Sequence, residues 1–124
     1  MAYVNTEGLR VRSGSGDLVP KNVKTATGAS AWVDIGEAKE IVAQLHADAG
    51  TGTSPTLDVK FQTSYNGTDA TAVDLPSGAF TQVLAAASNQ IKNIPAMHRF
   101  IKAVWTITGT TPGFDFGVYV STRN

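Results

Sequence analysis

The two histidines of this chain are the first residues to consider for chemistry. His46 and Asp48 fall on the same face of a segment that alternates apolar and polar residues, and His98 would join them if its strand lay alongside. A zinc site needs three or four nitrogen, sulfur or carboxylate ligands. We favour the alternative that both histidines lie on polar strand faces, and we predict no metal site and no cofactor.

The ten carboxylates are scattered along the chain, mostly in predicted turns or on polar strand faces. This scatter favours no glycosidase pair. Asp69 and Asp74 are conceivable calcium ligands, but their spacing matches no known ligand pattern. No Gly-x-Ser-x-Gly elbow is present, and Ser13-Gly14-Ser15-Gly16 lacks the lysine of a phosphate loop. We therefore predict no catalytic residues and a protein that is not an enzyme.

Composition excludes several classes of partner. Ten basic residues balance ten acidic residues, whereas a nucleic-acid-binding protein normally carries a basic excess. There are no cysteines, so disulfides and thiolate metal sites are excluded. No apolar stretch is long enough to span a bilayer, and no signal peptide is visible at the start. We expect a soluble protein that is made in the cytoplasm and binds neither nucleic acid nor membrane.

Alternation of apolar and polar residues predicts the elements that must position these side chains. It is clearest over residues 57–65, where Leu57, Val59 and Phe61 share one face, and it is followed by the turn dipeptide Asn66-Gly67. The same pattern predicts strands over residues 31–35, 41–48, 72–75, 80–83, 90–94, 99–109 and 114–120, with loops at 49–55 and 109–113. Turn signals recur every 8–12 residues, a spacing typical of an all-β antiparallel sandwich. We predict a β-sandwich with a jelly-roll-like order.

The first part of the chain differs in composition from the rest. Residues 1–29 hold two short extended segments, a flexible Ser-Gly stretch and Pro20, and they contain few candidate core residues. We predict an extended N-terminal arm over residues 1–29 and a β-sandwich domain over residues 30–124. A frayed terminus is the alternative.

Aromatic residues fall into two groups by their place in the alternation. Most share a face with other apolar residues and are predicted to be core, with Trp32 an early anchor; their alternative use is a carbohydrate platform. Phe100 and Tyr119 lie on the face opposite the core set of their strands, as do Val42 and Val104. We predict a subunit interface formed by Phe100, Val104 and Tyr119. Burial under a covering loop is the alternative.

A run of short segments from Trp32 onward resembles the capsid decoration (cement) proteins of tailed bacteriophages, which are virion proteins with a β-sandwich or jelly-roll core. The segments are Trp32-Val33-Asp34-Ile35-Gly36, Ser54-Pro55-Thr56-Leu57-Asp58-Val59, Gln62-Thr63-Ser64-Tyr65-Asn66-Gly67, Ala79-Phe80-Thr81-Gln82-Val83, His98-Arg99-Phe100-Ile101-Lys102-Ala103-Val104 and Phe114-Asp115-Phe116. The resemblance covers roughly three-quarters of the chain.

The resemblance implies a function and a set of partners. Such proteins are assembled in the host cytoplasm, bind the outer surface of the capsid, often as homotrimers, and stabilise contacts between major capsid proteins. An N-terminal arm often makes the capsid contact by adding a strand to a sheet edge. The resemblance thus implies a capsid-binding arm in this chain, consisting of Tyr3, Val4, Leu9, Arg10, Val11 and Arg12.

A carbohydrate-binding or tail-associated adhesion module is the alternative function. It predicts exposed aromatic residues in the loops near residues 49–55, 66–70 and 109–113. Those loops consist mostly of glycine, threonine and serine, so the composition favours the capsid-binding role over the alternative.

Overall fold

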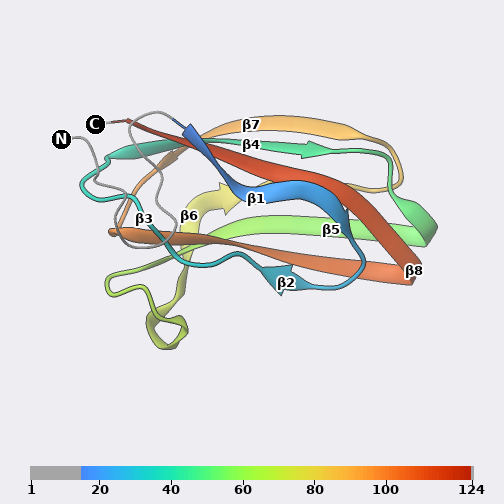
Figure 1. Cartoon of the computed structure of the whole chain (residues 1–124), viewed down its shortest axis with the longest axis horizontal. Coiled ribbons are helices and arrows are strands. Elements are labelled where there is room, and N and C mark those ends of the chain that lie inside the picture. The colour runs from blue at the N-terminus through green and yellow to red at the C-terminus, as the bar shows by residue number, and fades with distance from the viewer. Residues whose placement is uncertain (1–14, 124) are drawn as a thin grey trace.

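The computed structural model describes residues 15–123 and shows an all-β antiparallel sandwich (Figure 1). The strands are β1 (Ser15–Lys24), β2 (Gly28–Ala29), β3 (Val33–Asp34), β4 (Glu40–Ala47), β5 (Thr51–Ser64), β6 (Val73–Ala79), β7 (Ser88–Pro95) and β8 (Phe100–Arg123). A short 3-10 helix, η1 (Asp69–Thr71), is the only helix among the described residues. None of the helical structure in that part of the chain is long and apolar enough to cross a membrane.

Strand β8 belongs to both layers of the sandwich. Its first half pairs with β5, β2 and β3, and β6 pairs with the far side of β5; we call this layer sheet A. Its second half pairs with β4 and β1, and β7 pairs with the far side of β4; this layer is sheet B. Figure 1 shows β5 and β8 turning between the layers at the right-hand end of the molecule.

The core between the sheets follows from the alternation along the strands. In sheet A, Leu57 is paired with Ile107 and Phe61 with Ala103, and all four side chains are buried. In sheet B, Leu45 is opposite Val118, and both are fully buried. Successive residues of a strand point to opposite faces, so the intervening polar side chains form the two outer faces. The predicted period-two strands are confirmed for 41–48, 57–64 and both halves of β8.

Several predicted boundaries are wrong. The predicted loops at 49–55 and 109–113 lie largely within β5 and β8, where Thr51 pairs with Gly113 and Thr53 with Thr110. The Asn66-Gly67 dipeptide does not form a two-residue hairpin, because residues 65–72 with η1 connect β5 to β6. The segment at 80–83 makes a single bridge, between Val83 and Leu57, instead of a strand.

The start of the described chain is part of the sandwich. Strand β1 pairs along the second half of β8, and Leu18 and Val19 are buried in the core. Pro20 lacks an amide hydrogen, and the register shifts between Val19 and Asn22, as expected for a proline in an edge strand. The predicted arm therefore differs from the structure over residues 15–29, whereas its residues Tyr3, Val4, Leu9, Arg10, Val11 and Arg12 lie outside the described residues.

Lys24, the last residue of β1, binds several groups at one side of the sandwich. Its ammonium group donates hydrogen bonds to the carbonyl oxygens of Pro20, Asn22 and Phe116 at 3.0–3.1 Å. It also lies 4.4 Å from the centre of the Phe116 ring and 5.8 Å from that of Trp105. Partial burial lowers the pKa of this lysine, because desolvation disfavours its charged form.

Candidate functional site

A cluster of three side chains occupies the outer face of sheet A near the connection from β5 to β6. Lys102 of β8 donates to Asp69 Oδ1 at 2.6 Å, and the indole N–H of Trp32 donates to the same oxygen at 2.9 Å. The Lys102 ammonium lies 5.0 Å from the centre of the Trp32 ring. We call Trp32, Asp69 and Lys102 the Trp32 cluster.

The Trp32 cluster fixes the indole on the surface of the sandwich. The Lys102 side chain is only 11% exposed, although its strand position points away from the core. Hydrogen bonds from Lys102 and then Trp32 lower the pKa of the Asp69 carboxyl. Trp32 itself is half-buried on this outer face, so its prediction as a core anchor is wrong. Its neighbours Val33 and Ile35 point inward instead and are fully buried.

Further ion pairs surround the cluster on sheet A. Arg99 donates two hydrogen bonds to the Asp34 carboxylate, at 2.7 and 2.9 Å. Lys60 and Gln62 both donate to Asp74 across the β5–β6 pair, at 3.0 and 3.2 Å. This part of the outer face is therefore a network of paired charges with an indole held among them.

The outer face of sheet B is more apolar. Gln44 of β4 lies between Tyr119 of β8 and Ile91 of β7, and Val42 lies in the next row. Ile91 is 67% exposed, and Val42 and Tyr119 are half-buried. We call Val42, Gln44, Ile91 and Tyr119 the Tyr119 face. Tyrosine and aliphatic side chains at exposed strand centres are typical of surfaces that contact other proteins.

The three residues predicted as one subunit interface lie on two different faces. Phe100 and Val104 are on the outer face of sheet A, whereas Tyr119 is on the outer face of sheet B. The connection at Gly67 packs on the Phe100 ring, since a Cβ atom there would lie 3.0 Å from it, and the Arg99 guanidinium is 5.7 Å from the ring centre. The structure thus gives Phe100 the covering loop that was the alternative interpretation.

The histidines considered as zinc ligands are not brought together. His46 Nδ1 lies 2.6 Å from Asn89 Oδ1, near the start of β7, whereas His98 follows the end of β7, beyond Pro95. Asp48, the third candidate, accepts a hydrogen bond from Lys21 at 2.8 Å. Asp69 and Asp74 are each bound by a lysine. Within residues 15–123, no group of three or more histidine and acidic side chains is arranged to hold a metal ion.

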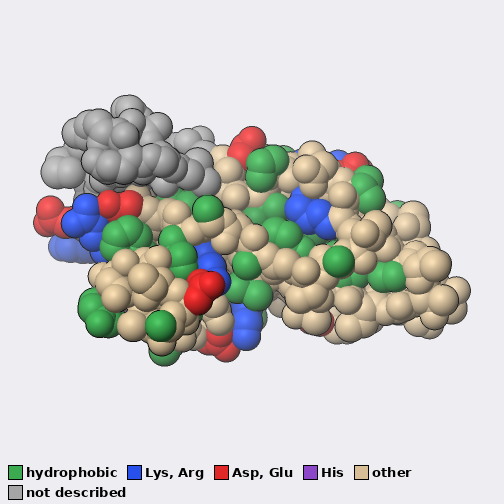
Figure 2. Space-filling view, turned by 60° about the horizontal axis from the view of Figure 1, so that its bottom comes forward, with side chains coloured by type: hydrophobic (Ala, Val, Ile, Leu, Met, Phe, Trp, Pro, Cys, Tyr) green, Lys and Arg blue, Asp and Glu red, His purple; other side chains and the backbone are tan. Residues whose placement is uncertain are grey.

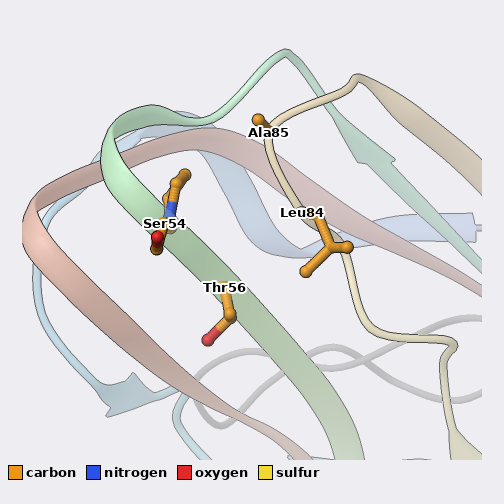
Figure 3. A pocket seen from close by; sticks show the side chains of 5 residues that line it. Ser54, Thr56, Leu84 and Ala85 are labelled. Carbon is orange, nitrogen blue, oxygen red and sulfur yellow. The ribbon is translucent and has the colours of Figure 1, made fainter.

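A small open pocket lies at the opposite end of the molecule from the Trp32 cluster. It has a volume of about 290 Å³ and is lined by Ser54, Pro55, Thr56, Leu84 and Ala85. Figure 3 shows Leu84 and Ala85, from the segment before β7, facing Ser54 and Thr56 on β5. Ser54 has a φ of 49°, which turns the strand and opens space beside Pro55.

Sequence reasoning missed most of these features. It did predict the core aromatic residues correctly: Phe61, Phe80, Phe114 and Phe116 are buried, and Trp105 packs against the core, so none of them forms a carbohydrate platform. Trp32 alone in that set lies on the outer face. In the sequence, Asp69 is 37 residues from Trp32 and 33 residues from Lys102. No local sequence pattern predicts a contact between residues so far apart. The pocket at Leu84 had one usable signal, the run of apolar residues before Ser88 that is too short for a helix.

Comparison with known proteins gives matches among solved structures alone. No protein-family model matches the chain, and no curated protein does. A structure described as "CBM4 structure and function" has a TM-score of 0.48 and 20% identity, over 81% of this chain and 64% of that one. The SPBc2 prophage-derived protein YomS has a TM-score of 0.42 and 17% identity, over 86% of this chain and 91% of that one. A structure of infectious bursal disease virus, Gx strain, has a TM-score of 0.48 and 8% identity, over 88% of this chain and 31% of that one.

These similarities are weak. The chain spans less than two thirds of the length of the CBM4 structure and about a third of that of the bursal disease virus protein. Identities of 20% and below with TM-scores under 0.5 carry no argument about ligand, partner or location. The function must therefore be inferred from the surfaces of this chain.

Proposed function

We propose that this protein is a structural component of a tailed-bacteriophage virion. In this role it binds the outer surface of the capsid as a homo-oligomer, a homotrimer in the simplest form, and stabilises contacts between neighbouring major capsid proteins after assembly in the host cytoplasm. The resemblance of the segments from Trp32 onward to decoration proteins supports the partner. The observation that carries the binding role is the Tyr119 face, an apolar strip on an otherwise polar sheet surface.

The Tyr119 face fits a protein partner for physical reasons. The side chains of Val42, Ile91 and Tyr119 stand on adjacent strands of a hydrogen-bonded sheet, so they are held in place before binding. Preorganised side chains lose little conformational entropy when a partner covers them. Burying one exposed aliphatic side chain contributes about 1.5–3 kcal/mol.

The N-terminal arm is the second part of the proposal. Strand β1 begins at Ser15, whose register partner is Ser121 of β8. We propose that Tyr3, Val4, Leu9, Arg10, Val11 and Arg12 add a strand to a sheet edge of the capsid protein. Because Leu18 and Val19 are core residues, a deletion that tests the arm must stop at residue 14.

Sedimentation with undecorated capsids of the phage that encodes the chain tests the proposal. We expect the wild-type protein to pellet with the capsids, and a Tyr119→Glu, Ile91→Glu double variant to bind at least about tenfold more weakly, since hot-spot aromatics contribute ~2 kcal/mol or more. Deletion of residues 2–14 should also weaken binding. Tyr65→Glu, at another exposed aromatic side chain, is the matched control. Wild-type protein that stays in the supernatant would overturn the proposal.

Carbohydrate binding at the Trp32 cluster is the second candidate function. A sugar ring packs its C–H groups on an aromatic face and donates its hydroxyl groups to carboxylates, and here an indole is fixed beside the largely exposed Asp69 side chain. The expected result is that neutral oligosaccharides on an array bind the wild type and that Trp32→Ala abolishes the signal. Tyr65→Ala should leave it unchanged. An array without signal for the folded wild-type protein would remove this candidate.

A further inference from the structure

Within residues 15–123, three segments at one end of the molecule contain no charged side chain. Residues 49–57, 80–88 and 106–113 contain no Asp, Glu, Lys, Arg or His. They meet in space because Leu57 pairs with both Ile107 and Val83, and the amide of Gly50 donates to the carbonyl oxygen of Ala85 at 2.9 Å. We call these three segments the uncharged end. Figure 2 shows its surface at the right-hand extremity, in tan and green without red or blue.

The charges of the described chain gather elsewhere. The ion pairs of sheet A lie toward the Trp32 cluster, and Lys21 with Asp48 and Asp115 borders sheet B. The chain has ten basic and ten acidic residues, and none of them falls in these three segments. A surface of hydroxyl, methyl and backbone groups has a low desolvation cost compared with one that carries ions.

The uncharged end also exposes apolar side chains beside a pocket. Leu84 protrudes and is 55% exposed, and the three alanines that follow it are exposed as well. The pocket beside Pro55 lies next to Leu84, so the surface offers both a projecting apolar side chain and an apolar recess. Small side chains at Ala85, Ala86 and Ala87 allow two backbones to approach closely.

We infer that the uncharged end is the contact between copies of this chain. Residues close to the symmetry axis meet their own copies, so a charge there would meet its own sign. A surface without charge avoids this repulsion. A contact with a charged partner would not require an uncharged surface. The inference rests on the homo-oligomer in the proposed function, and it places the contact between copies away from Phe100, Val104 and Tyr119.

Analytical ultracentrifugation of the full chain tests the inference. We expect wild-type protein to form an oligomer at micromolar concentration and Leu84→Glu to sediment as a monomer, because a carboxylate without a partner would have to be desolvated in an uncharged contact. Val73→Glu is the matched control, since Val73 is 56% exposed in β6, toward the charged part of the molecule. It should keep the wild-type mass. The wild-type oligomer should also persist at high salt, which would weaken a contact made by exposed ion pairs.

Two outcomes would overturn the inference: a monomeric wild-type protein, or a Leu84→Glu variant that keeps the wild-type mass. Circular dichroism and the melting temperature of Leu84→Glu confirm that a monomer is folded. The capsid experiment separates the two proposals. Monomeric Leu84→Glu that still pellets with capsids would support the uncharged end as a contact between copies alone, and a wild-type oligomer that never pellets would overturn the capsid role and leave this inference standing.

Discussion

Lysine–aspartate pairs are the characteristic residue-scale feature of both outer faces. Lys21 binds Asp48, Lys60 binds Asp74 and Lys102 binds Asp69, at 2.6–3.0 Å. In each case the hydrogen bond from lysine is the largest cause that lowers the pKa of the aspartate. All three pairs join different elements: Lys21 joins β1 to the segment that follows β4, Lys60 joins β5 to β6, and Lys102 joins β8 to η1.

These pairs predict a loss of stability in acid. A carboxyl whose pKa is lowered by folding stabilises the folded state at pH values above its unfolded pKa, and that contribution disappears as the pH falls through the folded value. We expect the urea midpoint to fall on acidification from neutral pH to below the ordinary aspartate value of 3.8. Asp74→Asn should lose less stability over this range, because it cannot titrate.

The control for this experiment is Asp58→Asn on the same face. Asp58 accepts a hydrogen bond from Gln82 at 3.0 Å, whereas Asp74 is bound by a lysine. The control should keep the acid sensitivity of the wild type. Equal acid sensitivity of Asp74→Asn and wild type would contradict the assignment of stability to the Lys60–Asp74 pair.

At the scale of elements, the long strands β5 and β8 bend together from one sheet to the other. Gly52 and Ser54 have positive φ values of 96° and 49°, and Gly109 and Thr111 have values of 126° and 47°. The glycine- and threonine-rich composition there predicted loops. The residues do turn the chain, but both strands bend at the same point. Thr53 remains paired with Thr110, with a register shift on either side, so pairing continues through the bend.

Gly109 is a residue of this bend that tolerates substitution poorly. A Cβ atom there would lie 3.0 Å from Pro55 Cα and from the carbonyl oxygens of Thr53 and Ser54, in a backbone region that side chains rarely adopt. We expect Gly109→Ala to lower the free energy of unfolding by ~1–3 kcal/mol in urea denaturation. Thr106→Ala, at an exposed β8 position, should change it by less than ~1 kcal/mol. An unchanged Gly109→Ala midpoint would show that the bend can relax.

At the scale of the whole molecule, β8 organises the fold. It pairs with β1, β2, β3, β4 and β5, so this strand joins all the strands that precede residue 65 in the described chain. The resulting sandwich has two unlike ends: the Trp32 cluster with its paired charges, and the uncharged end with its apolar pocket. The Tyr119 face lies on the outside of sheet B. One protein of this size can therefore present one surface to a capsid and another to its own copies.

The sequence predicted the elements better than their arrangement. Alternation identified the core of β4, β5 and β8, because each residue's neighbours two positions away already show which face is apolar. Around Trp32 the alternation groups Val33 with Ile35 and Trp32 with Asp34, but the prediction followed the hydrophobicity of the indole and placed Trp32 in the core. It also missed β1, whose Leu18 and Val19 look isolated until β8 lies beside them. The arm and interface residues remain predictions.

By itself the sequence determined the all-β class, the period-two strands and the absence of disulfides, since these depend on residue type and on neighbours close in the chain. Only the tertiary structure decided that Asp69 and Lys102 fix Trp32 on the surface, and that three uncharged segments far apart in the chain form one end. The physical reason is the same in both cases. Contacts between distant residues depend on which strands pair and in which register, and the alternation within one strand shows which face is buried but not which strand lies beside it.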